Sequence, residues 1–195
     1  MKGTLAITGD VQADRLLNTD GTALLLGMLL DQQVLMEWAF TGPSTLRQRL
    51  GHLDARKIAA MDVDDFVALC CEKPAIHRYP AAMGRRIHEV CRQLVEHYKG
   101  KADNIWKGAS SGAELYDRLR ELPGYGEEKA RIFVAILGKR MAVQPEGWQT
   151  AAGKFGDDTP RSVADVADAD SLGKVREWKK AAKAAKRDKQ DRAIS

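Results

Sequence analysis

One short run of the sequence restricts the fold more than any other feature. Residues 22–30, Thr-Ala-Leu-Leu-Leu-Gly-Met-Leu-Leu, are apolar on every side of a helix, and Asp20 is a suitable cap for its first turn. The run is far too short to span a bilayer. A helix without a polar face is buried on all sides. The chain must therefore wrap its other elements around one central helix.

The rest of the chain also has helical spacing. Apolar residues recur three and four positions apart across 81–98, and Ser111 with Glu114 forms the pattern of a capping box. Glycine and proline predict helix ends at Gly42-Pro43 and Gly138. Further helices are expected over 34–40, 44–50, 54–60, 62–70, 127–137 and from Thr159-Pro160 onward, with a loop over 139–156. No strands pair convincingly, so the sequence predicts an all-α fold, a two-lobed bundle of about eight to ten helices.

Charge is distributed unevenly along the chain. The 195 residues carry a net charge of +4, and the segment 174–195 holds nine Lys and Arg against three Asp and Glu. The tail therefore carries +6 and the remaining residues carry −2. A basic tail of this kind often contacts nucleic acid, although a solvated helix end or a disordered tail has the same composition.

The cysteines, at positions 70, 71 and 91, form an odd set with an adjacent pair. This pattern is unlike a disulfide framework or a zinc site and favours reduced, buried thiols. Reduced thiols are typical of the cytoplasm, and the N-terminus lacks the apolar run of a signal peptide. We therefore expect a cytoplasmic protein without a membrane partner.

The segment 122–126, Leu-Pro-Gly-Tyr-Gly, has the composition of a tight turn between two helices. Its two glycines allow the backbone to turn sharply and to approach a ligand closely. The second helix begins directly after them, so its free N–H groups and its dipole suit a phosphate. An ordinary corner between two helices is the alternative, and the phase of the leucines in the preceding helix favours the phosphate-binding turn.

Residues 122–130, Leu-Pro-Gly-Tyr-Gly-Glu-Glu-Lys-Ala, resemble the hairpin of the helix-hairpin-helix base-excision DNA glycosylases, the superfamily that includes endonuclease III. Residues 25–33, Leu-Leu-Gly-Met-Leu-Leu-Asp-Gln-Gln, resemble the central helix of that family, which ends in a glutamine-bearing turn. The order and spacing of the two motifs make the resemblance more specific than either motif alone.

The resemblance implies a glycosylase-like domain over 1–156, with its hairpin at 112–138. A C-terminal helix and basic tail over 157–195 would then pack on that domain or trail from it. The implied partner is damaged duplex DNA bound by a monomer, and structured RNA is the alternative partner.

The same resemblance assigns the residues that would contact nucleic acid. In the family a side chain of the glutamine-bearing turn fills the gap that a flipped nucleotide leaves in the duplex, a role that falls here to Gln32 or Gln33. Two glutamines that merely cap the helix are the alternative. The expected contacts of the hairpin with nucleic acid are Gly124, Tyr125, Gly126 and Lys129.

The catalytic pattern of the family is not reproduced. The position of its aspartate holds Gln144, whose amide cannot carry the negative charge that a cationic sugar needs; Glu146 could supply it if the loop register differs by two residues. The position of the family's lysine holds Glu128, a second candidate. Lys129 follows it, and one residue along a helix turns a side chain by about 100°, so Lys129 is expected to point elsewhere.

A lesion pocket needs a flat face on which a flipped base can stack, and Trp38 and Trp148 are the best placed in the sequence. Core packing is the alternative for Trp38. The four-cysteine iron–sulfur motif of the family is missing, so no iron–sulfur cluster and no other cofactor is expected. A monovalent cation bound at the hairpin is the one ion that the resemblance allows.

Three functions remain open from the sequence. The first is a monofunctional glycosylase, a hydrolase that releases a damaged base during base-excision DNA repair. The second is a non-catalytic helix-hairpin-helix module that binds DNA or structured RNA. The third is a helical scaffold for protein interactions.

Overall fold

A computed structural model of the chain describes residues 3–194, with side chains as far as residue 185. Its secondary structure confirms the predicted all-α class, since the described residues form helices and a single isolated β-bridge. The helices are α1 (Val11–Thr19), α2 (Gly21–Leu30), α3 (Met36–Leu50), α4 (Ala55–Ala59), α5 (Val63–Cys71), α6 (Pro80–Tyr98), α7 (Asp103–Lys107), α8 (Gly112–Arg120), α9 (Glu127–Arg140), α10 (Trp148–Ala152), η1 (Gly153–Phe155), η2 (Val163–Asp165) and α11 (Ala169–Ile194).

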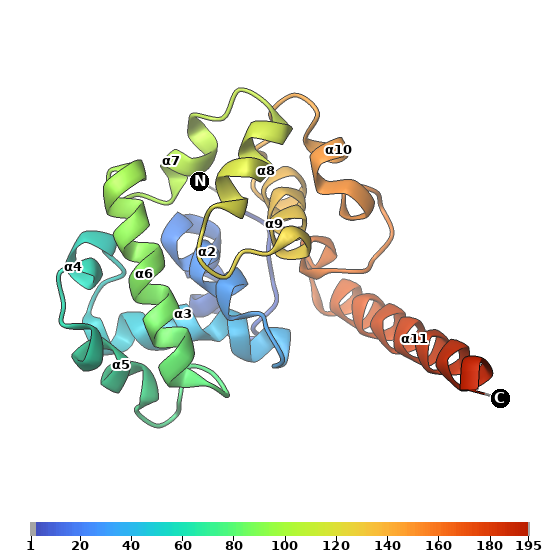
Figure 1. Cartoon of the computed structure of the whole chain (residues 1–195), viewed down its shortest axis with the longest axis horizontal. Coiled ribbons are helices and arrows are strands. Elements are labelled where there is room, and N and C mark those ends of the chain that lie inside the picture. The colour runs from blue at the N-terminus through green and yellow to red at the C-terminus, as the bar shows by residue number, and fades with distance from the viewer. Residues whose placement is uncertain (1–2, 195) are drawn as a thin grey trace.

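The predicted central helix is α2, which lies in the middle of the molecule with the other helices around it (Figure 1). Every residue of α2 is buried. Its first turn is capped as expected, because the Asp20 carboxylate accepts hydrogen bonds from the N–H groups of Thr22 and Ala23. Gly27 lets α3 come close: a Cβ there would meet the Phe40 ring at 2.7 Å. The other helices therefore surround α2, as the apolar run predicts.

The helices α3 to α6 form one lobe, and here the predicted stop at Gly42-Pro43 is wrong. The helix α3 runs through both residues, which are buried. A Cβ on Gly42 would lie 2.5 Å from Leu30 of α2, so the two helices are in close contact at this point. Burial against α2 outweighs the local cost of proline in a helix. The predicted helices over 54–60, 62–70 and 81–98 are confirmed as α4, α5 and α6.

The second lobe contains α8, α9 and α10. Ser111 caps α8 by accepting a hydrogen bond from the Glu114 N–H at 3.2 Å, as predicted. The Glu114 carboxylate, however, accepts from the N–H of Ser110 at 2.7 Å and not from that of Ser111. The predicted stop at Gly138 is wrong, because α9 continues to Arg140. A Cβ on Gly138 would meet the Trp148 ring at 2.3 Å, so this glycine admits an indole ring and does not end the helix.

The C-terminal segment begins differently from the prediction. No helix starts at Thr159-Pro160 within the described chain, because Asp157 holds a turn there by accepting from the Thr159 N–H at 2.9 Å and pairing with Arg161 at 2.7 Å. Beyond this turn the segment packs onto α9 through the ion pair of Lys139 with Asp165 at 2.6 Å.

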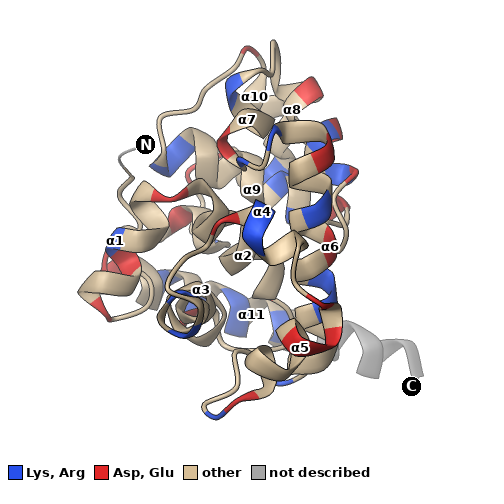
Figure 2. Ribbon diagram, turned by 90° about the vertical axis from the view of Figure 1, so that its left-hand side faces the viewer, with Lys and Arg blue, Asp and Glu red and all other residues tan. Residues whose placement is uncertain are grey.

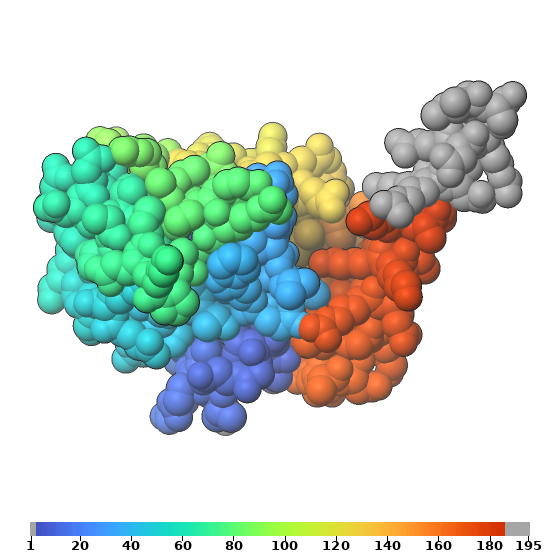
Figure 3. All heavy atoms as spheres, turned by 90° about the horizontal axis from the view of Figure 1, so that it is seen from below, coloured from blue at the N-terminus to red at the C-terminus, as the bar shows by residue number. Residues whose placement is uncertain are grey.

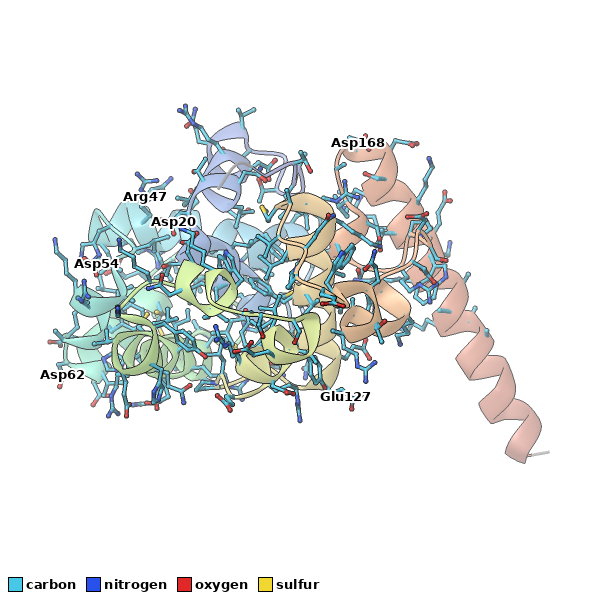
Figure 4. All side chains as sticks on the ribbon, turned by 90° about the horizontal axis from the view of Figure 1, so that it is seen from above. Asp20, Arg47, Asp54, Asp62, Glu127 and Asp168 are labelled. Carbon is cyan, nitrogen blue, oxygen red and sulfur yellow. The ribbon has the colours of Figure 1, made fainter. Side chains whose placement is uncertain are left out.

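The last helix, α11, starts beside Asp168 and projects away from the body (Figures 1 and 4). Val175 on its second turn is fully buried. The basic tail predicted over 174–195 thus begins on a docked helix, and its side chains from 186 onward lie outside the described residues. None of the helices in the described range is long and apolar enough to cross a membrane.

Candidate nucleic-acid interface and interlobe pocket

The hairpin of α8 and α9 is docked onto the end of α2. The Tyr125 hydroxyl donates to the Leu25 carbonyl at 2.6 Å, and the Lys129 ammonium donates to the Leu29 carbonyl at 2.7 Å. Gly124 has φ +82°, and a Cβ there would lie 2.7 Å from Leu29 and 2.8 Å from Arg86. Each of the two hydrogen bonds joins residues one hundred positions apart. The fold therefore brings the two motifs of the sequence together.

The first turn of α9 is open to solvent. Gly126 is its N-cap, and no described side chain caps it. Apart from its chain neighbours, no described atom lies within 4 Å of a Cβ built on Gly126, so the space beside this N-cap is open. Glu127 and Glu128 also lie in this turn, and Glu127 points away from the molecule at its edge (Figure 4). Arg131, 2.9 Å from Glu127, and Lys154, 4.0 Å from Glu128, offset these negative charges.

The two glutamines of the turn after α2 are held differently. Gln32 is anchored: its amide oxygen accepts from Arg86 at 3.2 Å, and its carbonyl is 2.9 Å from the His77 Nε2. Burial lowers the pKa of His77, which favours the neutral ring. Gln33 is exposed and has a positive φ of 57°. Of the two predicted wedge residues, Gln33 is the one whose side chain projects freely.

The two tryptophans predicted to stack on a base occupy different settings. Trp38 is 42% exposed and is not a core residue; its indole N–H donates to the Ala75 carbonyl at 3.2 Å, beside the ring of His77. Trp148 was expected in an open loop, but it lies on α10 and is 8% exposed, with its ring against Gly138. The prediction of a stacking face at Trp148 is corrected, because packing covers the ring.

Two of the predicted catalytic positions lie away from the glycine turn. The Glu146 carbonyl accepts from the N–H of Gly112 at 2.7 Å, and the Gln144 amide donates to the Gly138 carbonyl at 2.9 Å. Gly112 starts α8 and the glycine turn follows its end, roughly 13 Å along the helix axis. Both positions are therefore at the opposite end of the hairpin from Gly124. The third, Glu128, is at the turn.

The interlobe pocket, of about 560 Å³, lies where the hairpin, the glutamine turn and the C-terminal segment meet. Figure 3 shows a hollow on this side, between the blue chain that follows α2, the yellow α9 and the orange-red C-terminal segment. It is lined by Met28, Asp31, Gln33, Val34, Glu128, Lys129, Ile132, Lys154, Phe155, Arg161, Ser162, Val163, Trp178, Lys179 and Ala182. Charged groups, aromatic rings and aliphatic side chains thus share one concave surface.

Two opposite charges in the pocket are partly buried. Burial raises the pKa of Asp31, although the charges of Lys179 and Lys129 act against that rise. Burial also lowers the pKa of Lys129 to about 8, and Asp31 opposes this shift. Paired shifts of this kind inside a concave site mark candidates for proton transfer.

Sequence reasoning missed Asp31, Trp178 and Lys179. Asp31 had a detectable signal, since it is a carboxylate placed directly between a wholly apolar helix and the glutamine pair. No local sequence pattern identifies Trp178 and Lys179, because their place in the pocket depends on how α11 docks. The Lys129 side chain lines the same pocket as Asp31, and its ammonium donates to the Leu29 carbonyl.

Among the described residues no three His, Cys, Asp or Glu side chains gather as a metal site would require. Comparison of the chain with models of protein families, with curated proteins and with solved structures found no match. The function must therefore be argued from the geometry of the hairpin, the glutamine turn and the pocket.

Proposed function

We propose that the protein is a monomeric, cytoplasmic DNA-binding glycosylase that releases a damaged base by hydrolysis. One observation carries the proposal: the first turn of α9 and the glutamine turn both line one pocket of about 560 Å³. A protein that reads bases by flipping needs a grip on the backbone, a filler for the duplex and a cavity for the base, all within reach of one nucleotide.

The grip is the open first turn of α9. Its free N–H groups and dipole favour an anion, and they contact phosphate without reading the base. Lys129 and Arg86 bring positive charge to the docked face of the hairpin. The carboxylates of Glu127 and Glu128 weaken this grip only in part, because each has a cation beside it.

Gln33 is the filler, because Gln32 is occupied by Arg86 and His77. The cavity for the base is the interlobe pocket, in which Trp178 is the exposed aromatic side chain. Stacking on its ring recovers part of the few kcal/mol that unstacking a base costs.

The second candidate is a module that binds DNA or structured RNA and breaks no bond. It is favoured by one specific observation: Gln144 stands where the resemblance expects an aspartate, and Glu146 lies at the wrong end of the hairpin to replace it. Release of a base from any damaged duplex separates the two candidates.

Gly126→Val tests the grip better than a change at Gly124. A side chain at Gly124 would collide with Leu29 and Arg86, whereas the space beyond Gly126 is open. The added side chain should block a phosphate and weaken binding to duplexes of any sequence roughly tenfold, the loss of about one charge-assisted hydrogen bond. Fluorescence anisotropy measures the affinity.

The matched control is Gly173→Val on α11, another glycine with open space around its Cβ position. It should leave the affinity unchanged. Thermal melting of both variants checks that they fold. Unchanged affinity in a folded Gly126→Val protein would show that the hairpin does not hold the phosphate.

A further inference from the structure

We infer that Asp31 is the carboxylate that activates water in the interlobe pocket, and that α11 completes this site by placing Lys179 beside it. The inference rests on the proposed base release. It assigns the reaction to the end of the central helix, and not to Glu128, Gln144 or Glu146.

Asp31 is held in place by the helix that it ends. Its N–H donates to the carbonyls of Gly27 at 3.1 Å and Met28 at 3.3 Å, within a helix that is buried throughout. The pocket's other carboxylate is less suited to the role. The side chain of Glu128 is 73% exposed and lies beside the Lys154 ammonium, so water screens its charge.

The cations around Asp31 come from two elements that are far apart in the sequence. The charge of Lys129 acts on it from α9, and the charge of Lys179 acts on it from α11. Lys179 is positioned, since its ammonium contacts the Met36 sulfur at 3.4 Å. Arg176, one turn earlier on α11, forms an ion pair with Glu37 of α3.

Trp178 precedes Lys179 on the same helix and lines the same pocket, with the Arg161 guanidinium 5.7 Å from its ring centre. Together with buried Val175, these contacts fix the turn of α11 that closes the pocket. The charged groups that face Asp31 from the surrounding elements are therefore Lys129 and Glu128 on α9, Lys154 on η1, Arg161 before η2, and Lys179 on α11.

The chemistry is hydrolysis of the bond between the sugar C1′ and the base nitrogen. The C1′–N bond breaks and its electron pair leaves with the base, so positive charge develops on the sugar. The Asp31 carboxylate stabilises that charge and accepts a proton from water while the water oxygen bonds to C1′. The proton then passes from Asp31 to solvent, the departing base takes up a proton from solvent at the nitrogen that left C1′, and no oxidant or reductant is consumed.

The carboxylate must be ionised to act as a base, so release should increase as the pH rises through the pKa of Asp31. Lys179 acts against the rise in that pKa. Lys179→Gln should therefore move the acidic limb of the pH profile to higher pH. Lys179→Arg should restore it, and Lys180→Gln, on the exposed face of the same helix, should not shift it.

The test uses the full-length chain and duplexes that contain uracil, 8-oxoguanine, an alkylated purine or a mismatch. Abasic sites are counted after alkaline cleavage, and binding to the same duplexes is measured by anisotropy. Asp31→Asn should lower release by at least about a hundredfold, as expected for a lost general base, while binding is retained. Asp64→Asn, which removes an exposed carboxylate paired with Arg85, is the matched control.

Three results would overturn the inference. Release by Asp31→Asn at the wild-type rate would show that Asp31 takes no part in the reaction, while the proposed glycosylase activity stands. Loss of release in Glu146→Gln instead would assign the reaction to Glu146. Tight binding without release from any duplex would remove both the reaction and the role of Asp31, and would leave a binding module. A pH profile unchanged by Lys179→Gln would show that α11 does not influence the ionisation of Asp31.

Discussion

Single side chains of the hairpin serve the fold as much as they serve a ligand. Tyr125 was expected to contact nucleic acid, but it is 3% exposed and donates its hydroxyl to Leu25. The caps at Asp20 and Ser111 could be predicted from the sequence because their partners are two or three residues away. The partner of Tyr125 is one hundred residues away, and no local pattern reveals it.

Tyr125→Phe should therefore lower the free energy of unfolding by about 1 kcal/mol, the net value of a hydrogen bond within a folded protein. Urea denaturation measures it. Tyr79→Phe, at a ring that is 45% exposed, is the control and should change little. A Tyr125→Phe protein as stable as the wild type would mean that the buried hydroxyl contributes nothing net.

Asp31 has a predictable effect on stability as well. Burial makes the pKa of Asp31 higher in the folded protein than in the unfolded chain. Below the pKa of the unfolded chain the carboxyl is neutral in both states and costs no stability. As the pH rises through the folded pKa, the folded protein loses stability because it must hold a buried charge. Asp31→Asn removes this loss. The variant should melt at a higher temperature than the wild type at neutral pH, and at about pH 3 the difference should vanish.

The control for this measurement is Asp64→Asn, which changes an exposed carboxylate. A lower melting temperature for Asp31→Asn at neutral pH would contradict the expectation. It would mean that attraction to Lys129 and Lys179 outweighs the burial of the Asp31 charge.

At the scale of elements, residues that usually end helices lie inside them here. Gly42-Pro43 lies within α3 and Gly138 within α9, in each case where another element packs closely. Most helices could be predicted from apolar spacing, but α1 and α7 were not predicted, and neither was α10. The short α7 and α10 are held chiefly by contacts with distant residues: Trp106 of α7 lies against Gly21, and Trp148 of α10 lies against Gly112 and Gly138.

Gly138→Ala tests whether packing decides this position. Alanine favours a helix over glycine by about 1 kcal/mol, but the new methyl group must displace the Trp148 ring. Overpacking of this kind costs about 1–3 kcal/mol, so the variant should be less stable in urea. Gly173→Ala, in a helix with open space, should be slightly more stable. Equal stabilisation in both variants would contradict the packing argument.

At the scale of the whole molecule, the pocket is the part that sequence reasoning could not assemble. The hairpin and the glutamine turn were recognised because each has a local pattern. The pocket's remaining wall comes from residues 154–182, whose docking depends on tertiary contacts. On the side that carries α4, α5 and α6, Figure 2 shows residues of both charge signs interspersed.

The distribution of charge predicts what the end of the tail contributes. Residues 186–195 hold four Lys and Arg against two Asp. A chain that ends at Ala185 should fold normally, since Val175 and the pocket wall are kept. The slope of log affinity against log salt should fall by at most about four, as for the loss of four phosphate contacts.

Titration of a fluorescent duplex at several salt concentrations measures that slope, with melting as the check on folding. An identical slope for the shortened chain would show that residues 186–195 do not contact the nucleic acid.

The two hydrogen bonds from the hairpin to α2 have one further consequence. Tyr125 and Lys129 join the glycine turn and the start of α9 to consecutive turns of a fully buried helix, and Asp31 follows directly after that helix. The hairpin cannot slide relative to the pocket without breaking both bonds. In a complex with DNA, the number of nucleotides between the bound phosphate and the nucleotide in the pocket would then be constant, whatever the sequence of the strand.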